Sequence, residues 1–317
     1  MKCPNCDCRN TIFRFRSGDR QFQTTPKQFE IRECLYCGVL FLSPQPDQTE
    51  IFNSYPQGYW VKPRGNEQEL RSRLAEIYRR IMLYTHIKFV KQTIRMKSRR
   101  KTPIYLLDVG CGDGGFLEAC GHTPCFGIDS SLIAVKAAKA RGQNVVQGSF
   151  IKYPFIKKSF SIITMFHFLE HVSPPEHYLK AASHLLKDSG DLIIQVPNVD
   201  SLQARIFKGK WGGYSVPRHL INYSAKTLKK ILHQNGFTVI RQNLFSLRDD
   251  ASTLAMSLIP SLYPPYHSTK ETEMDKISPM IRDLGFLGLT LISIPFTIIE
   301  TILGQGATVM FHAKPIK

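Results

Sequence analysis

The sequence predicts an α/β fold, with a largely parallel sheet and a small cysteine-rich module, from three observations. The first is a strand–turn–helix–strand unit over residues 104–130 that ends in an acid. The second is the alternation of apolar runs with helical patterns that continues beyond this unit to residue 240. The third is a pair of Cys-x-x-Cys motifs near the amino terminus. With 317 residues, the chain is long enough for about two domains and a full core.

The unit at residues 104–130 predicts a nucleoside pocket. An apolar run precedes the turn Asp108-Val109-Gly110-Cys111-Gly112-Asp113-Gly114-Gly115, and a helical pattern and a second apolar run follow it. Glycines permit positive φ and close approach of a ligand to the backbone. The start of the following helix offers unpaired N–H groups and the positive end of a dipole. Asp129 ends the second run, at a position where an acid can bind both hydroxyls of a ribose.

The acid at Asp108 indicates which nucleoside binds. The glycine spacing also fits a dinucleotide fingerprint, but a carboxylate at this position sits badly beside a pyrophosphate and well beside an ammonium and a sulfonium. The run from Asp108 to Gly114 resembles motif I of class I S-adenosylmethionine (SAM)-dependent methyltransferases, and Ile128-Asp129 resembles their ribose-binding acid. A glycine turn that only closes a βαβ unit is one alternative, and an NAD-dependent oxidoreductase, which Asp108 disfavours, is another.

The resemblance implies a seven-stranded class I methyltransferase (Rossmann-like) sheet and a set of residues that bind SAM. These are Asp108, Gly110, Cys111, Gly112, Asp129, Ser130, Ser149, Phe150 and Phe166. Ser149 stands where this class often has an acid that binds the adenine amino group. The adenine contact is therefore open at this position, where a backbone group can substitute.

The amino-terminal cysteines predict a zinc ribbon. Cys3-x-x-Cys6 and Cys34-x-x-Cys37 are separated by 27 residues rich in β-forming side chains. Each knuckle places two thiolates on one turn, and two knuckles close a tetrahedron around Zn²⁺. Such a four-thiolate site is structural, and metal binding there supplies folding energy to a module too small for its own core. Cys8 is a spare thiol, and free cysteines in a hairpin are the alternative.

The charge of the chain limits its partners and its location. The formal net charge is +17, and residues 62–101 carry 13 Lys/Arg against three Glu. Such a segment can bind nucleic acid, an anionic membrane face or a phosphorylated substrate, or be a solvated helical face. No apolar signal-peptide region follows Met1, and the paired cysteines favour reduced thiols. These features predict a cytoplasmic location, with contact at the inner face of the membrane left open.

Two segments supply candidate catalytic residues. His167, Glu170 and His171 follow the predicted strand 160–166, at the carboxyl edge where open α/β sheets bind ligands. The loop 208–224 contains Pro217-Arg218-His219-Leu220, which resembles a loop in zinc-ribbon methyltransferases. In related sugar C-methyltransferases, the matching histidine is the proposed general base, and it falls on His219.

Histidine suits proton removal near neutral pH, and arginine can hold a phosphate or carboxylate with two hydrogen bonds. The alternatives are structural for both segments: Arg218 and His219 pin the loop, and Glu170 and His171 orient the next helix.

The sequence divides into a zinc ribbon (1–45), a linker and basic helical lid (46–101), a SAM-binding core (102–243), an apolar helical insertion (244–306) and a final strand (307–317). The uncharged stretch 284–299 is shorter than the ~20 residues that cross a bilayer. The chain must also return to supply the last strand, so no transmembrane helix is predicted. Burial or a homodimer face comes first, and peripheral membrane contact through residues 284–303 remains open.

These observations predict a SAM-dependent methyltransferase with structural zinc that modifies oxygen or carbon. The resemblance implies a small-molecule acceptor, with or without a phosphate, such as a sugar nucleotide, glycan precursor or lipid-linked intermediate. An RNA methyltransferase is the main rival, because some rRNA enzymes join a zinc ribbon to this fold. Base-modifying enzymes, however, need an aromatic residue after Pro-Pro, and Glu176 follows Pro174-Pro175. A non-catalytic SAM-binding module is the second rival, and Ser149 supports it.

Overall fold

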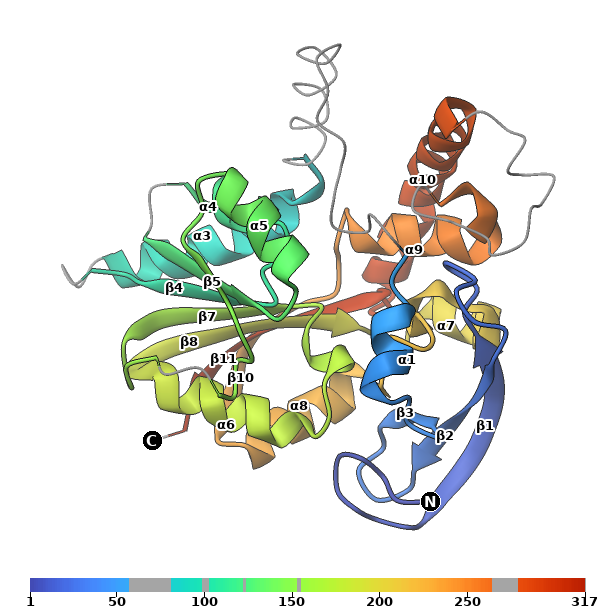
Figure 1. The fold of residues 1–317 in the computed structure, drawn as a ribbon, viewed down its shortest axis with the longest axis horizontal. Coiled ribbons are helices and arrows are strands. Elements are labelled where there is room, and N and C mark those ends of the chain that lie inside the picture. The colour runs from blue at the N-terminus through green and yellow to red at the C-terminus, as the bar shows by residue number, and fades with distance from the viewer. Residues whose placement is uncertain (57–80, 99–102, 122–123, 153–154, 264–278, 317) are drawn as a thin grey trace.

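A computed structural model describes residues 1–56, 81–98, 103–121, 124–152, 155–263 and 279–316 of the protein. These residues form two β-sheets, and Figure 1 shows the larger sheet across the middle of the molecule with helices on both faces. The predicted linker and basic helical lid, residues 46–101, falls partly outside the described residues.

The larger sheet has seven strands in the spatial order β10-β11-β8-β7-β4-β5-β6. Its strands are β4 (Leu106–Val109), β5 (Cys125–Asp129), β6 (Val145–Gln147), β7 (Phe160–Phe166), β8 (Leu186–Pro197), β10 (Phe237–Asn243) and β11 (Thr308–Pro315). Strand β11, which lies between β8 and β10, runs antiparallel to the other strands of this sheet. The predicted seven-stranded mixed sheet is confirmed. Because β4 has β5 on one side and β7 on the other, a ligand crevice is expected at its carboxyl end.

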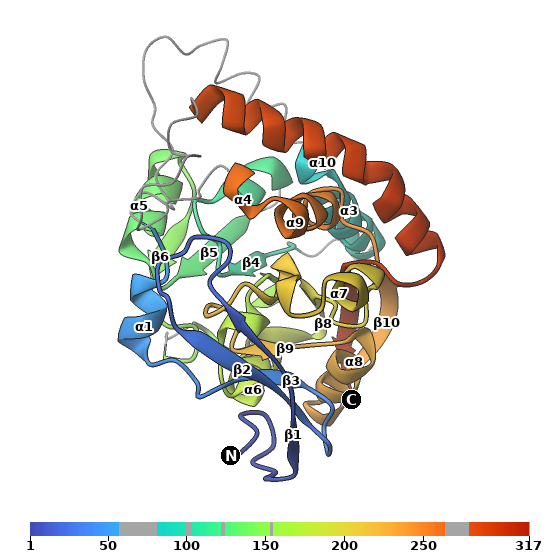
Figure 2. The same cartoon turned by 90° about the vertical axis from the view of Figure 1, so that its right-hand side faces the viewer.

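Helices cover both faces of this sheet. Figures 1 and 2 show that one face carries α3 (Tyr84–Ser98), α4 (Gly115–Cys120) and α5 (Leu132–Ala140). The opposite face carries α6 (Pro175–Leu185) and α8 (Ala225–Gln234). Ser224 caps α8, since its side chain accepts from the Thr227 N–H. The central strands are buried on both faces, which explains why β4, β7 and the second half of β8 are mostly apolar.

The smaller sheet joins the amino-terminal module to a distant loop. Its order is β1 (Thr11–Gly18), β2 (Gln28–Cys34), β3 (Leu40–Ser43) and β9 (Ile221–Asn222), and a short helix α1 (Gln48–Asn53) follows β3. Strand β9 belongs to the loop after β8, which also contains α7 (Leu202–Phe207) and the short 3₁₀ helices η2 (Lys208–Lys210) and η3 (Gly212–Tyr214). Leu40 pairs with Asn222 and Phe41 with Ile221. The cysteine module and this loop are therefore one structural unit.

The last strand is reached through a helical segment that differs from the prediction. It contains α9 (Asp249–Leu258), η4 (Pro260–Leu262) and α10 (Pro279–Ile302), and α10 packs on α9 (Figure 2). The apolar helix is 24 residues long, more than the predicted stretch 284–299, because the helix runs through Pro295 and takes in flanking residues. Burial within the chain or a homodimer face was expected first for this helix. Burial of its apolar residues is wrong, because Ile292 is 76% exposed, whereas the homodimer face and the membrane contact stay predictions. Composition alone does not tell which side of a helix faces solvent.

Candidate active site

The glycine turn after β4 has the predicted left-handed backbone. Gly110, Gly112 and Gly114 have φ angles of 73°, 53° and 75°. A Cβ atom on Gly110 would lie 2.8 Å from a ring carbon of Phe168, which is closer than real Cβ contacts come. Gly110 therefore has two reasons to be glycine, its backbone angle and the close approach of Phe168.

Asp129 lies against this turn from the end of the neighbouring strand β5. One carboxylate oxygen accepts from the Gly112 N–H at 3.0 Å, and the other accepts from the Ser131 N–H at 2.8 Å. Burial raises the pKa of Asp129 above the usual range of an aspartate. The acid and the turn, 17 residues apart in sequence, thus form one polar corner at the carboxyl edge of the sheet.

Asp108 is buried beneath the same corner. Its carboxylate accepts a hydrogen bond of 2.6 Å from the Thr164 hydroxyl on β7. Burial, together with the nearby charge of Asp129, raises the pKa of Asp108 to about 7. A cation placed beside two such acids would lower both pKa values, because it favours their charged forms. The corner therefore suits a ligand that carries positive charge.

The remaining predicted cofactor residues surround this corner at different depths. Cys111 and Phe150 are buried, Phe166 is half-buried, and Ser130 and Ser149 are exposed. The Gly148 N–H donates to the Asp129 carbonyl at 3.0 Å, so Ser149 follows directly along the sheet edge. The Phe166 ring lies between those of Phe116 and His86, at 5.0 and 4.8 Å.

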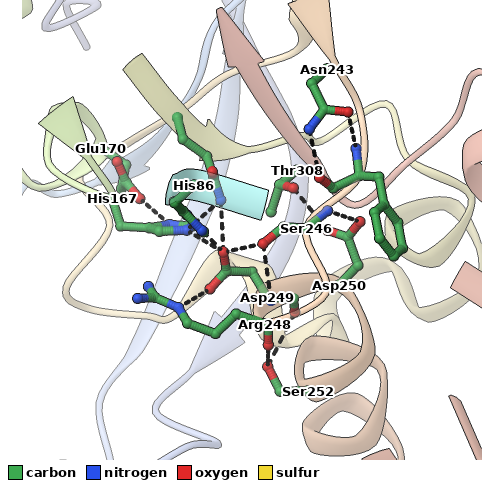
Figure 3. A network of polar contacts seen from close by, with 12 residues as sticks. His86, His167, Glu170, Asn243, Ser246, Arg248, Asp249, Asp250, Ser252 and Thr308 are labelled. Carbon is green, nitrogen blue, oxygen red and sulfur yellow. Dashed lines mark hydrogen bonds and ion pairs between the residues drawn. The ribbon is translucent and has the colours of Figure 1, made fainter. Parts of the chain in front are cut away.

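His167 belongs to a partly buried ionic network at the end of β7 (Figure 3). It has a left-handed backbone, with φ of 51°. Its Nδ1 lies 3.1 Å from a Glu170 oxygen, and its Nε2 lies 3.2 Å from a carboxylate oxygen of Asp249. Burial opposes protonation of this imidazole, but the two carboxylates raise the pKa of His167 to about 9. His167 is therefore a cation at neutral pH.

Asp249 and His86, which were not predicted from the sequence, complete this network (Figure 3). Asp249 begins α9 and accepts from Arg248 at 2.8 Å and from the Ser246 hydroxyl at 2.6 Å. His86 Nε2 lies 3.6 Å from Asp249, and neither nitrogen of His86 has a hydrogen bond within the described residues. Burial lowers the pKa of His86 to about 3. The charged triplet Arg248-Asp249-Asp250 in an otherwise apolar segment was the only signal available in the sequence.

Two groups of side chains, one within this network and one beside it, have the donor atoms of a metal site. His86, His167 and Asp249 form one group, and Glu170, His171 and His219 form the other. Within each group, the ligand atoms lie within 4.8 Å of one another. Both sets combine imidazoles with a carboxylate, as divalent transition metals prefer.

His219, on the long loop, faces the carboxylate of Glu170. Its Nδ1 lies 2.8 Å from the Gly213 carbonyl, which can only accept, so Nδ1 carries the proton and Nε2 has a lone pair. Nε2 is 4.0 Å from a Glu170 oxygen, and the ring stands edge-on to that of His171 at 4.6 Å. Burial, with His171 and His167 nearby, holds the pKa of His219 well below its usual range. His219 is therefore a neutral acceptor at neutral pH.

The contacts of Arg218 differ from those of its neighbour His219. Its guanidinium is buried and donates to the Asp19 carboxylate at 2.9 Å, to the Ser54 carbonyl at 2.8 Å and to the Ser215 hydroxyl at 3.1 Å. It also lies 4.3 Å from the centre of the Phe22 ring. The donors of Arg218 thus bind the amino-terminal module and its own loop.

The four predicted zinc ligands come together. Cys3 Sγ lies 3.6 Å from Cys37 Sγ, and Cys6 Sγ lies 3.5 Å from Cys34 Sγ. All four sulfurs lie within 4.8 Å of one another. Sulfurs around tetrahedral Zn²⁺, at about 2.3 Å from the metal, are about 3.8 Å apart. The four side chains therefore fit zinc, and the spare thiol of Cys8 is not part of the cluster.

Comparison with known proteins agrees with this geometry. A family model described as a methyltransferase domain matches residues 78–242, just over half of the chain. An uncharacterised protein of Mycobacterium tuberculosis is 31% identical over 139 residues, covering 42% of this chain and 47% of its own length. The ubiquinone biosynthesis O-methyltransferase of Coxiella burnetii is 27% identical over 164 residues, covering 48% and 63%. The chain thus spans about half the length of the curated relatives it matches.

One solved structure shares the fold. A Galdieria sulphuraria protein, proposed to be a sarcosine dimethylglycine methyltransferase, aligns with a TM-score of 0.50 and 13% identity. The alignment covers 74% of this chain and 86% of that protein. The strand order and the acid-flanked glycine turn define the fold of the class I SAM-dependent methyltransferases. The chain belongs to the methyltransferase-domain family.

Proposed function

We propose that the protein transfers the methyl group of SAM to a small-molecule acceptor. The observation that carries this proposal is the contact between the Asp129 carboxylate and the Gly112 N–H, at the carboxyl end of β4. It supports a site in which Asp129 binds the ribose hydroxyls and the glycine turn faces the methionine portion, above the buried acid Asp108. SAM, when bound, supplies an electrophilic methyl group, so the protein must chiefly orient the acceptor and exclude water.

His219 is the residue we assign to the proton of the acceptor. The Gly213 carbonyl fixes its tautomer, which leaves Nε2 unprotonated and able to accept a proton from a hydroxyl. Glu170, 4.0 Å away, can stabilise the imidazolium that results. His167, already a cation, cannot act as a base near neutral pH, and we assign it to holding Glu170 and Asp249 in place.

Arg218 is best explained as a positioning residue, because its hydrogen bonds to Ser215, Ser54 and Asp19 hold the loop that carries His219. The zinc ion that fits the four cysteines would act on the same loop indirectly. It would order the module whose strand β3 pairs with β9, next to His219.

The acceptor we favour is a hydroxyl compound such as a sugar nucleotide, a glycan precursor or a lipid-linked intermediate. A hydroxyl acceptor must lose its proton during transfer, and the neutral, buried His219 can accept that proton. One relative is an O-methyltransferase by name, which supports the same choice.

Ligand binding and methyl transfer test this proposal separately. Thermal shifts of the purified protein with SAM, its demethylated product, NAD and RNA should show stabilisation by the first two only. Labelled SAM should then transfer its methyl group to a low-molecular-weight or lipid fraction of a cell extract. Stabilisation by NAD alone overturns the proposal. Label found in RNA changes the acceptor class, and SAM binding without transfer to any fraction indicates a binding module.

A further inference from the structure

Helix α10 is almost free of charge along its whole length. Its 24 residues include only three charged side chains, Arg282, Asp283 and Glu300. By length and composition, Met280–Ile302 is the one helix among the described residues that could cross a membrane. Figure 2 shows it along the outer edge of the molecule, outside α9.

The side of α10 that faces the protein is mostly polar. Apart from Phe286, its buried residues are Thr290, Ser293, Thr297 and Glu300, spaced as one helical face. The three hydroxyls donate to carbonyls of their own helix, at 2.7 to 2.9 Å. Glu300 accepts from the Gln203 side chain at 2.9 Å. The protein thus receives the polar side of this helix.

The opposite side of α10 is apolar and exposed. Ile292 is 76% and Ile302 is 78% exposed. The other large exposed side chains of this face are Met280, Ile281, Leu284, Leu291, Ile298 and Ile299. A 24-residue helix is about 36 Å long, so the apolar side forms a continuous strip of that length. A helix of a soluble protein has the reverse arrangement, with the apolar side inward.

The flanking elements keep α10 from crossing a bilayer. Its inner side packs on α9, whose first residue Asp249 contacts His167. Six residues after α10 ends, β11 begins at Thr308 and pairs with β8 inside the large sheet. Both neighbours therefore belong to one packed body, and the helix can only lie along its surface.

We propose that α10 docks the protein flat on the surface of an anionic phospholipid bilayer, with its exposed apolar side among the acyl chains. An apolar strip of this length in water points to a partner surface. The formal net charge of +17 favours an anionic bilayer over a second copy of the chain as this partner. Two copies of the chain would repel each other, whereas anionic headgroups attract a cation of this size.

This docking goes beyond the proposed function and does not depend on it. It would place α9, and with it the Asp249 end of the histidine network, on the membrane side of the large sheet. A lipid-borne acceptor would then be close at hand, but the docking itself requires no catalysis.

Vesicle flotation of the full chain tests the proposal. The protein should float with phosphatidylglycerol-containing vesicles at low salt and less with phosphatidylcholine vesicles. A triple variant, Ile292→Gln/Ile299→Gln/Ile302→Gln, should bind the anionic vesicles roughly tenfold more weakly or worse, because each residue loses buried apolar area. Replacing Ile156, Ile240 and Ile316 by Gln, three exposed isoleucines away from α10, is the matched control and should leave binding unchanged.

Several results would overturn the docking. The first is no flotation of the wild type with anionic vesicles, and the second is equal flotation of the α10 triple variant. A third is dimerisation in sedimentation velocity that the α10 variant abolishes, without vesicle binding, which would assign the strip to a second copy. SAM binding, measured in parallel, should be the same in all variants. A failure of docking is thereby distinguished from a failure of the proposed methyl transfer.

Discussion

The carboxylate of Asp19 lies 2.9 Å from the guanidinium of Arg218, although 199 residues separate them in the chain. Both side chains are almost fully buried. Burial opposes ionisation of the acid, yet the arginine keeps the pKa of Asp19 below its usual range. This ion pair joins the amino-terminal module to the loop that carries His219, so its loss should affect both stability and catalysis.

Breaking the pair on one side should destabilise the protein strongly. Arg218→Met leaves Asp19 as a buried charge without its partner, which typically costs about 3–5 kcal/mol. Chemical denaturation should show this loss. The double variant Asp19→Leu/Arg218→Met removes both charges and should be more stable than Arg218→Met alone. If the double variant is as unstable as the sum of both single variants, the pairing contributes nothing.

The zinc module should be needed for turnover more than for SAM binding. Cys34→Ser removes one of the four thiolates, and we expect it to lower the zinc content and to release β3 from β9. Methyl transfer should then fall steeply, while calorimetry with SAM shows little change, because the glycine turn lies in the other sheet. Cys8→Ser is the control and should retain about one zinc per chain. Equal loss of SAM binding and turnover would contradict the division of roles.

Asp129 should determine the affinity for SAM. Asp129→Asn keeps the shape of the side chain but removes the charge that we assign to the ribose. Hydrogen bonds to charged groups contribute about 1.5–3 kcal/mol, so the affinity should fall roughly 10- to 150-fold. Asp188→Asn, at an exposed aspartate paired with Lys158, is the matched control. Unchanged SAM affinity in Asp129→Asn would remove Asp129 from the pocket.

His219 should act on the chemical step alone. His219→Gln leaves a polar side chain in place but removes the imidazole lone pair, and kcat should fall by roughly 10²- to 10⁴-fold. The affinity for SAM should stay the same, since His219 lies on the loop rather than at the glycine turn. His177→Gln, on the exposed face of α6, should behave as the wild type. Full activity of His219→Gln would make this histidine structural.

The protonated state of His167 predicts how stability depends on pH. Its pKa is raised from 6.5 to about 9 on folding, so the folded state favours the imidazolium. The resulting stability is fully present below pH 6.5, declines as the pH rises, and is lost above about 9. The Tm of the wild type should therefore fall over this range more than the Tm of His167→Gln. Parallel curves for the two proteins would show that His167 is not charged in the folded state.

The sequence was sufficient to predict those parts of the site whose residues lie close together in the chain. The glycine turn and Asp129 lie within one βαβ unit, with Gly112 only 17 residues before Asp129, and the zinc ligands follow a recognisable Cys-x-x-Cys spacing. Contacts between distant segments could not be predicted in the same way. Nothing near Arg218 indicates Asp19 as its partner, and nothing near His167 indicates Asp249. The apolar composition of α10 was evident from the sequence, but which side of the helix faces outward depends on its packing against α9.

The pairing of β9 with β3 has a consequence for anyone who builds chimaeras of this family. A graft that exchanges only residues 1–45 would transfer β1, β2 and β3 without their fourth strand, β9. The recipient's own loop would then have to pair with a β3 edge from another protein. The transferable unit is discontinuous, and it includes the segment from Lys208 to Ser224. Recombination between homologues should respect that boundary, because a crossover between these two stretches separates surfaces that fit only each other.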